Sequence, residues 1–478
     1  MKFDVVVIGG GSAGYAAART AADLGAKVGI VDRGPLGGLC ILRGCMPSKT
    51  LLRSSDIMSL MHRAREFGLS VSDVKADMAA INDRKRALIK EFADYRVQQL
   101  KSPRFTLIRG RARFVSPTEI RVGSRAIQAR SFVVATGSTL QKIPIPGLED
   151  VGYITSDEVL DQRKLPASAI VLGGGAIATE LGQFLCRMGT RTTLIQRSGH
   201  ILSNTDEDLA RPIEARFREE GMKLFTGTRL TRFTQSKGRA TPGKELVTRD
   251  KKLVTAHFEQ AGKLRRASAE TVLQALGRVP DLDGLNLNRA GVQVERGRIV
   301  VDDRMRTTAP NVFAAGDCTG LFEVVHIAIQ QGEAAGHNAI AGTRKQSVDY
   351  RLGAFVVFTE PQLGSVGLTE KACRESRIEY RVATYPFDDH GKSMTMGETH
   401  GFVKLLCDPE SGEILGGHVV GPEASELMHE LVAVMYYRGT VHDLARIPHY
   451  HPTLSEILTY PAEELADQIP ETPKRRRR

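Results

Sequence analysis

Two cysteines, Cys40 and Cys45, lie with four residues between them in the stretch GLCILRGCMPSK, just before an apolar, helix-like run. Such a pair can ligate a metal, form a structural disulfide or act as a redox-active disulfide. The other cysteines of the chain are isolated, so no second close pair completes a four-ligand zinc site. A structural disulfide closing so small a loop would add little in a reducing cytoplasm, where catalytic disulfides are the usual exception. We therefore expect a redox-active pair and no metal site.

The residues that follow the second cysteine favour a reactive thiol. Pro47 is typical of the first turn of a helix, which places Cys45 at a helix N-terminus. The positive end of the helix dipole and the nearby Lys49 are expected to lower the pKa of this thiol from about 8.5 towards the range of about 3.5 to 7.5 found for activated cysteines.

The elements that must position these cysteines begin with a dinucleotide-binding fingerprint. Residues 4–14, DVVVIGGGSAG, read as an apolar strand that runs into Gly9, Gly11 and Gly14. A helix-like segment, YAAARTAADLGAK, and a second strand ending at Asp32 complete a βαβ unit. The glycines permit a tight turn and close approach of a pyrophosphate, and the acid can bind a ribose hydroxyl.

A second copy of this fingerprint begins at residue 169. The segment AIVLGGGAIATE contains Gly173 and Gly175, with Ala178 at the third position, where alanine is an allowed variant. Its second strand ends at Gln196 and Arg197, where a carboxylate would indicate NAD. The amide can still bind a ribose, and the guanidinium can pair with a 2′-phosphate, so the pattern favours NADP(H).

Two dinucleotides and a disulfide imply a flavin between them. A nicotinamide delivers a hydride, whereas a disulfide is opened by two electrons and thiolate chemistry, so FAD is the expected converter. The apolar segments 131–138 and 311–318 are expected to return to the first domain. Asp317, at the end of the second of these, could hold a flavin hydroxyl or cap a helix.

Length, composition and charge agree with a multidomain enzyme. The chain has 478 residues, which suggests three or so domains, and 41% of its residues are hydrophobic. The chain does not begin with a basic segment followed by a long apolar run, as a signal peptide would. We therefore expect a cytoplasmic protein with no membrane partner. The net charge of +11 raises the possibility of a nucleic-acid partner, but part of it lies in the terminal run 474–478, which reads better as a frayed tail.

At this point the sequence resembles the class I pyridine nucleotide-disulfide oxidoreductases, and within them the dihydrolipoamide dehydrogenases most, with glutathione and mercuric reductases as relatives. The match covers nearly the whole chain. The motifs that carry it are GLCILRGCMPSK, ATGS, GGGAIATE, ALGRVPD, NVFAAGDC, FTEPQLGSVGLTE and HYHPTLSE.

The resemblance implies a role for each catalytic residue. Cys40 would be the interchange thiol that meets the substrate, and Cys45 the thiol that faces the flavin. Lys49 and Glu180 would form an ion pair near the reactive end of the flavin.

His451 and Glu456 form the next pair implied by the resemblance. A neutral imidazole can take a proton from an attacking thiol, and a carboxylate on its other nitrogen fixes the tautomer. Family members place this pair at the active site of the partner subunit, which implies a homodimer whose active site is shared across the interface. A histidine before a proline can also be a plain turn residue.

The expected fold is α/β, with two doubly wound dinucleotide-binding domains and a C-terminal α+β dimerisation domain. Residues 1–147 would form the FAD domain, 148–277 the NAD(P) domain, 278–346 the return to the FAD or central region, and 347–478 the dimerisation domain. Further cofactor contacts are expected from the motif residues Ala135, Thr136, Gly137, Gly277, Arg278, Gly316 and Asp317.

Three functions remain open on this sequence. The first is an FAD-dependent dithiol-disulfide oxidoreductase that links NAD(P)H to a lipoyl-type substrate. The second is a reductase of glutathione-like, metal or quinone acceptors on the same scaffold. The third is a nucleic-acid-binding flavoprotein that uses the basic tail.

Overall fold

The computed structural model describes three stretches of the chain. They are residues 1–237, 252–340 and 345–471. The basic tail, residues 474–478, therefore lies outside the described residues. Within the described part, no helix is both long enough and apolar enough to span a bilayer.

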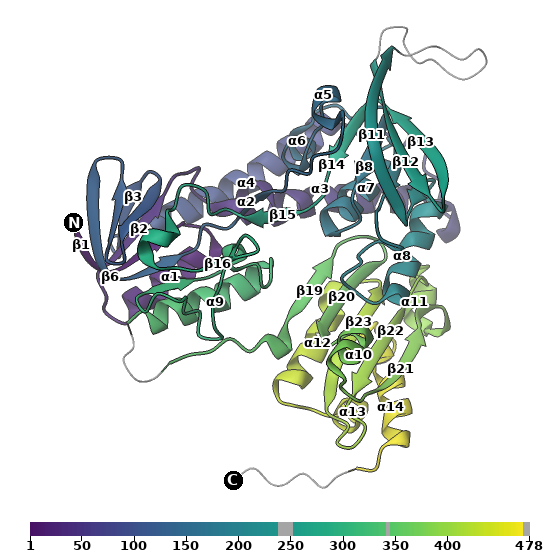
Figure 1. The fold of residues 1–478 in the computed structure, drawn as a ribbon. Helices are drawn as coiled ribbons and strands as arrows, with labels where there is room; N and C mark the ends of the chain where they lie inside the picture. The colour runs from purple at the N-terminus through teal and green to yellow at the C-terminus, as the bar shows by residue number, and fades with distance from the viewer. Residues whose placement is uncertain (238–251, 341–344, 472–478) are drawn as a thin grey trace. The chain divides into compact units, whose positions relative to one another are not determined.

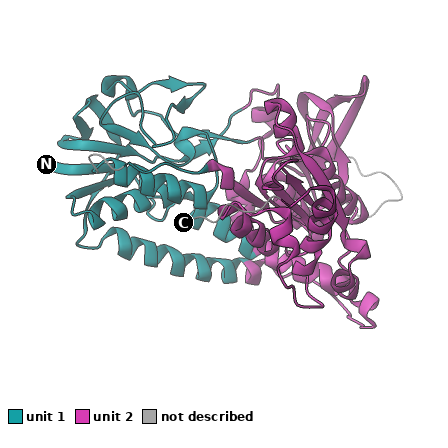
Figure 2. Cartoon of the chain, turned by 90° about the horizontal axis from the view of Figure 1, so that it is seen from below, with its two compact units in different colours: residues 1–50, 82–142, 277–349 teal, residues 51–81, 143–276, 350–478 magenta. Residues whose placement is uncertain are grey.

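The chain divides into two compact units, each of which is assembled from separate stretches of sequence (Figure 2). The first unit comprises residues 1–50, 82–142 and 277–349. The second unit comprises residues 51–81, 143–276 and 350–478.

A parallel sheet forms the centre of the first unit. Its strands are β1 (Lys2–Ile8), β2 (Val28–Asp32), β3 (Phe105–Arg109), β6 (Arg125–Val134) and β18 (Val312–Ala314), with β4 (Ala112–Ser116) and β5 (Glu119–Val122) added antiparallel at β6. Strand β1 pairs with β2 on one side and β6 on the other, and β18 pairs with β6. The predicted return of segments 131–138 and 311–318 to the first sheet is therefore confirmed. The valines of β1 are fully buried, as expected of a parallel strand covered on both faces.

Helices α1 (Ser12–Asp23) and α9 (Val325–Asn338) pack side by side against this sheet (Figure 1). Their close approach depends on two glycines one turn apart in α9. A Cβ at Gly332 would lie 2.2 Å from the carbonyl oxygen of Ala13, and one at Gly336 would lie 2.3 Å from that of Ala17. The two backbones can approach this closely only because these positions carry no side chain.

The helix predicted over the segment YAAARTAADLGAK begins and ends earlier than expected. It ends at Asp23, and Gly25 follows with φ +82°, a left-handed conformation that glycine adopts without strain. The sequence suggested that both redox cysteines lie just before a helix, but each of them lies within one. Cys40 lies in the short helix α2 (Gly38–Arg43), and Cys45 is the first residue of α3 (Cys45–His62).

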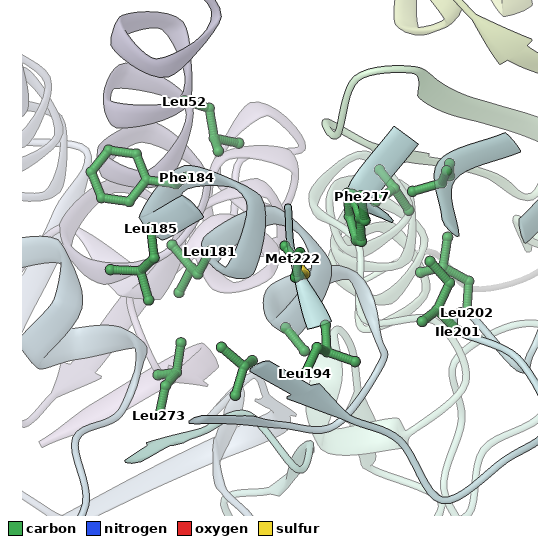
Figure 3. Packing of buried hydrophobic residues seen from close by; sticks show 14 of the residues in the cluster. Leu52, Leu181, Phe184, Leu185, Leu194, Ile201, Leu202, Phe217, Met222 and Leu273 are labelled. Carbon is green, nitrogen blue, oxygen red and sulfur yellow. The ribbon is translucent and has the colours of Figure 1, made fainter. Parts of the chain in front are cut away.

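A second parallel sheet opens the second unit, in the order β10-β9-β8-β14. Its strands are β8 (Ser168–Leu172), β9 (Arg191–Ile195), β10 (Lys223–Phe225) and β14 (Thr271–Gln274). Helices α7 (Ala176–Arg187) and α8 (Glu207–Glu219) follow β8 and β9 along the chain. The buried side chains of Leu181, Leu194, Phe217 and Met222 belong to one apolar core in this region (Figure 3). An antiparallel sheet of β11 (Thr228–Lys237), β12 (Lys252–Gln260) and β13 (Lys263–Ala269) follows.

The C-terminal part of the second unit is an antiparallel sheet with helices, as the predicted α+β domain requires (Figure 1). Its order is β19-β20-β23-β22-β21. The strands are β19 (Ala354–Val357), β20 (Gln362–Gly367), β21 (Arg381–Pro386), β22 (Phe402–Cys407) and β23 (Ile414–Gly421). The helices include α10 (Glu370–Ser376), α11 (Gly391–Met396), α12 (Ala424–Tyr436) and α14 (Thr459–Gln468). The fold class predicted from the sequence is confirmed.

Candidate active site

The first glycine-rich loop joins β1 to α1 and has no room for a side chain at Gly9 or Gly14. Gly9 has φ +108°, and a Cβ there would lie 2.2 Å from the carbonyl oxygen of Ala135. A Cβ at Gly14 would lie 1.8 Å from the carbonyl oxygen of Gly9. Gly11 is the N-cap of α1, and its helix start has no side-chain cap within the described residues. The first backbone N–H groups of α1 are therefore suited to an anionic ligand such as a pyrophosphate.

Asp32, at the end of β2, holds this loop in place. Its Oδ2 accepts a hydrogen bond of 2.8 Å from the backbone N–H of Gly10, and its Oδ1 accepts one of 2.5 Å from that of Gly34. The carboxylate therefore lies directly beside the glycine loop, where the fingerprint places the acid that meets a ribose.

The second glycine-rich loop repeats this geometry between β8 and α7. Gly173 has φ +110°, and a Cβ there would lie 2.4 Å from the carbonyl oxygen of Ala275. Gly175 is the N-cap of α7, where an added Cβ would meet nothing within 4 Å, and no described side chain caps the helix. The two loops thus share a glycine with positive φ and an open helix start.

A neutral amide replaces the acid beside the second loop. Gln196 is buried, and a Cβ on Gly174 would lie 2.9 Å from its side chain. The Oε1 of Gln196 accepts a hydrogen bond of 3.0 Å from the backbone N–H of Arg197. The side chain of Arg197 is exposed. This position thus combines an uncharged group near the loop with an accessible guanidinium.

The loops that follow β6 and β18 bring further predicted residues together. The Oδ2 of Asp317 accepts a hydrogen bond of 2.7 Å from the hydroxyl of Ser138, which also accepts one of 2.9 Å from the Nε of Arg278. Gly316, with φ +79°, is the N-cap of the short helix η3 (Asp317–Thr319), so Asp317 is the first residue of that helix and not its cap.

A buried hydroxyl in the same loops has no partner of its own. The Oγ1 of Thr136, between Ala135 and Gly137, is buried without a hydrogen-bond partner within the described residues. Such an atom is typical of a site where a bound ligand supplies the missing partner. Together with the cradle around Gly9, it fits a bound dinucleotide.

The two cysteines of the predicted redox pair lie in contact. The Cys40 thiol at α2 hydrogen-bonds the thiol of Cys45, and both side chains are partly buried. This hydrogen bond, followed by burial, raises the pKa of Cys40 well above its ordinary value, and the charge of Lys49 only partly opposes it. Cys45 is the first residue of α3, where the helix dipole favours a thiolate.

The two members of the predicted flavin-side ion pair lie in different compact units. Lys49 belongs to α3 within the first unit, and Glu180 belongs to α7 within the second. Glu180 is 4% exposed, and its Oε1 accepts a hydrogen bond of 3.0 Å from the backbone N–H of Phe358. Their pairing stays a prediction.

His451 and Glu456 do form a pair. The Nδ1 of His451 lies 3.0 Å from the Oε2 of Glu456, and the imidazole is 79% exposed whereas the carboxylate side chain is 10% exposed. His449, two residues earlier, contacts a different acid, with its Nε2 2.8 Å from the Oε1 of Glu430. An exposed imidazole held by a buried carboxylate can accept a proton from an incoming group.

One residue at this pair was missed by the sequence analysis. The Nε2 of His390 lies 3.3 Å from the Oε1 of Glu456, so the carboxylate lies between two imidazoles. No motif or spacing marks His390, because it lies far from the HYHPTLSE segment along the chain. A buried histidine can be recognised as part of such a site only after folding.

Two glycine-rich strand–loop–helix units and a pair of neighbouring cysteines are the architecture expected of a disulfide oxidoreductase, and comparison with known families agrees. The model of the pyridine nucleotide-disulphide oxidoreductases matches residues 3–332, and that of their dimerisation domain matches residues 354–462. The chain belongs to the pyridine nucleotide-disulphide oxidoreductase family. It is an FAD-dependent, pyridine nucleotide-linked disulfide oxidoreductase, as the sequence predicted.

Several known proteins are similar over nearly the whole chain. A dihydrolipoyl dehydrogenase of Thermus scotoductus is 35% identical, with 98% of each chain covered. A mercuric reductase of Bacillus cereus is 35% identical, with 95% of this chain and 70% of that protein covered. Among solved structures, LpdA of Mycobacterium tuberculosis has a TM-score of 0.83 at 29% identity, with 97% of this chain and 99% of that chain covered. The flavoprotein disulfide reductase RclA of Escherichia coli has a TM-score of 0.81 at 25% identity, with 96% and 99% covered.

The dimerisation-domain match has a consequence for the candidate base. It spans the C-terminal sheet and includes both His451 and Glu456. The match fits a homodimer, as predicted. It places the imidazole–carboxylate pair within the part of the chain that family members use for association.

Proposed function

We propose that this enzyme transfers two electrons between NAD(P)H and a lipoyl-type dithiol or disulfide through Cys40 and Cys45. The observation that carries the proposal is the contact between the thiol of Cys40 in α2 and that of Cys45 at the start of α3. Thiols in contact can form and break a disulfide without movement of the backbone over a long distance.

In dithiol oxidation, a substrate thiolate attacks the sulfur of Cys40 in the Cys40–Cys45 disulfide. A mixed disulfide forms, and Cys45 leaves as a thiolate stabilised by the helix N-terminus. The second substrate thiol then attacks the substrate sulfur of the mixed disulfide, so that the oxidised substrate leaves and Cys40 is released. Two electrons have passed to the protein. Bound FAD supplies the exchange between these two electrons and the hydride of the nicotinamide.

The protons of this reaction are assigned to His451. As a neutral base it accepts the proton of an attacking thiol and returns a proton to the leaving thiolate of Cys40. Glu456 on Nδ1 holds the ring so that Nε2 is the accepting nitrogen. We propose that the pair serves the cysteines of the partner subunit, so that the active site is shared across the homodimer interface.

The FAD site is assigned to the first unit. Its glycine loop, helix start and Asp32 have the geometry of a dinucleotide cradle, and the buried hydroxyl of Thr136 lacks a partner within the described residues. Lys49 and Glu180 are proposed as the ion pair near its reactive end. The residues proposed to hold FAD are Gly9, Gly11, Gly14, Asp32, Ala135, Thr136, Gly137, Gly316 and Asp317. Gly277 and Arg278 are proposed as further cofactor contacts.

The nicotinamide site is assigned to the second glycine loop, with a preference for NADPH. Gln196 brings no negative charge that would repel a 2′-phosphate, and the exposed guanidinium of Arg197 can pair with one. Gly173 and Gly175 provide the turn and the open helix start for the pyrophosphate.

The division into domains and the location also belong to this proposal. Residues 1–147 are assigned to FAD, 148–277 to NAD(P), 278–346 to the central return and 347–478 to dimerisation. A cytoplasmic location is supported by the use of an isolated, redox-active cysteine pair, which a reducing compartment keeps available for catalysis.

A reductase of other acceptors on the same scaffold is the second candidate. It is supported by the similarity to proteins named mercuric reductase and to RclA, which has been solved as a Cu(II) complex. Nucleic-acid binding by the basic tail is the remaining alternative. It would require salt-dependent retention on DNA that is lost when residues 474–478 are deleted.

A steady-state panel tests the proposal. Dihydrolipoamide with NAD⁺ or NADP⁺, and oxidised glutathione, Hg(II) and a quinone with NADH or NADPH, are compared at equal enzyme concentration. We expect the largest kcat/KM for the lipoyl substrate, lost in both Cys40→Ser and Cys45→Ser. Turnover of Hg(II) or of the quinone without turnover of dihydrolipoamide would favour the second candidate and contradict the first.

A further inference from the structure

We propose that His390 is a positioning residue that holds Glu456 in the orientation needed by His451. This inference rests on the proposed function, in which His451 is the base of the thiol chemistry. The three side chains form a continuous series, with 3.3 Å from His390 Nε2 to Glu456 Oε1 and 3.0 Å from Glu456 Oε2 to His451 Nδ1. Each carboxylate oxygen thus meets a different imidazole.

The surroundings of His390 fix its ring. Its side chain is fully buried at the junction of the short helix η5 (Phe387–Asp389) and α11. The rings of Phe387 and Tyr460 meet it edge to face at centroid distances of 6.3 Å and 6.4 Å. Its Nδ1 lies 2.7 Å from the Oγ of Ser393, which is also fully buried. The imidazole therefore cannot turn without disturbing the core around it.

These contacts determine which nitrogen of His390 carries the proton. Burial lowers the pKa of His390 below its ordinary value, and the charge of Glu456 opposes this only in part, so the ring is neutral. With the hydroxyl of Ser393 donating to Nδ1, the hydrogen is on Nε2, which lies 3.3 Å from Oε1 of Glu456 in a polar contact that lacks the angle of a hydrogen bond. The other tautomer would place the lone pair of Nε2 against a carboxylate oxygen and would be repelled.

The carboxylate needs this second contact because its own torsion is soft. The last χ angle of a glutamate has a broad energy profile, so a carboxylate held at one oxygen rotates easily. The imidazole of His451 is 79% exposed and gains little from packing. With Oε1 of Glu456 anchored by His390, Oε2 remains in line with Nδ1 of His451, and Nε2 of His451 stays available to the substrate thiol.

Two amide variants at position 390 test this role. His390→Gln and His390→Asn are both neutral and differ by one methylene, but only the longer amide carries its N–H donor out to the place of the imidazole Nε2. We expect kcat with dihydrolipoamide to fall about 10- to 100-fold in His390→Asn, the range that loss of an outer hydrogen bond to an orienting carboxylate costs at metal sites. His390→Gln should remain within about threefold of the wild type on the same reasoning.

Three further measurements separate positioning from structural damage. KM for dihydrolipoamide and the rate of NADPH oxidation by a quinone should change little in His390→Asn, because neither depends on a correctly held base. Flavin content should match the wild type. The matched control is His449→Asn. It breaks the pair that His449, two residues before His451, forms with Glu430, and it leaves Glu456 untouched. It should keep its kcat with dihydrolipoamide.

Every outcome bears on the inference. Equal rates in His390→Asn and His390→Gln, whether both normal or both lost, would overturn it, because reach of the donor would then be irrelevant. His451→Ala is assayed alongside. If the wild type oxidises dihydrolipoamide and His451→Ala does so equally well, the acid–base assignment fails and this inference fails with it. If His451→Ala loses activity while His390→Asn does not, only the role of His390 is refuted.

Discussion

Replacement of Lys404 by methionine is predicted to destabilise the second unit. The side chain of Lys404 is 1% exposed, although it lies in strand β22 of the C-terminal sheet. Its ammonium lies 3.2 Å from Asp206, 2.7 Å from Asp208 and 2.5 Å from Glu370. Lys404→Met keeps an unbranched side chain of similar length but leaves these carboxylates without their cation.

The magnitude follows from the burial of each acid. Asp206 is 4% exposed and Glu370 is 22% exposed, whereas Asp208 is 46% exposed and is screened by solvent. Removing one partner of a buried ion pair costs about 3 to 5 kcal/mol, because the remaining charge is left in a poorly solvated place. For a unit of about 290 residues that unfolds cooperatively, this corresponds to a fall of roughly 5 to 8 °C in Tm.

Thermal unfolding followed by far-UV circular dichroism measures this effect. The control is Lys90→Met, which removes an ammonium that is 77% exposed and paired with Asp94 one turn along the same helix. We expect no measurable shift from the control. A triple variant, Lys404→Met with Asp206→Asn and Glu370→Gln, should recover most of the loss, because neutralising a whole buried cluster costs much less than breaking it.

The loss should also depend on pH. Burial opposes ionisation of Asp206 and Glu370, but hydrogen bonds and the Lys404 charge outweigh it, so both carboxyl groups have a lowered pKa. Their contribution to stability is complete above their unfolded pKa of about 4 and is lost as the pH falls through the lower folded values. Without Lys404, one of the causes that lower these pKa values is removed, so the carboxyl groups of the variant protonate at a higher pH than those of the wild type. The difference between wild type and variant should therefore be largest near pH 7 and smaller near pH 4.

Two results would refute this reasoning. The first is a shift in Lys404→Met no larger than that in Lys90→Met, which would mean that Lys404 is not buried against its acids. The second is a triple variant less stable than the single one, which would mean that the carboxylates are not left uncompensated.

Three further predictions concern the active site. Arg197→Ala should weaken the use of NADPH relative to NADH by about 10- to 150-fold, the equivalent of a charge-assisted hydrogen bond, and an unchanged NADPH-to-NADH ratio of kcat/KM would contradict it. Cys40→Ser should show a long-wavelength thiolate-to-flavin absorption band that Cys45→Ser lacks, and identical spectra would mean that the roles are wrongly assigned. His451→Ala should lose disulfide turnover by about 10²- to 10⁴-fold with flavin content unchanged. Mixing it with Cys40→Ser under subunit exchange should restore roughly one quarter of wild-type activity, and no recovery after verified exchange would place the base in its own chain.

The two glycine loops show what local sequence can predict. In each, a glycine with positive φ lies two residues before the open start of a helix, so the spacing Gly-x-Gly is sufficient to find them. The carbonyl oxygens that exclude a Cβ at the first glycine, those of Ala135 and Ala275, come from distant segments. The same holds for His451 and Glu456, which lie five residues apart and meet within one turn of chain. The hydrogen bond between Cys40 and Cys45 likewise spans a short segment.

The lengths of elements were less predictable. The segment after the first loop has the composition of a helix as far as Lys27, yet α1 ends at Asp23 because Gly25 adopts a left-handed conformation. The short helix α2 that carries Cys40 was also missed. It is bounded by Gly37, with φ +132°, and by Gly44, so the backbone conformations of two glycines set its limits, and apolar periodicity does not.

Lys404 and His390 are the residues that only the tertiary structure explains. In the sequence, Lys404 interrupts an apolar strand and His390 lies in a polar turn, and neither belongs to a recognisable motif. Their partners come from distant segments: Asp206 and Glu370 for the lysine, and Glu456 for the histidine.

The sequence alone thus determined the family, the two glycine-rich loops, the cysteine pair and the pairing of His451 with Glu456, because each depends on residues that are close along the chain or on motifs that fold locally. The tertiary structure decided which charges are buried and which carboxylate oxygen meets which imidazole. Those properties depend on desolvation and on contacts between distant segments, and neither is defined until the chain has folded.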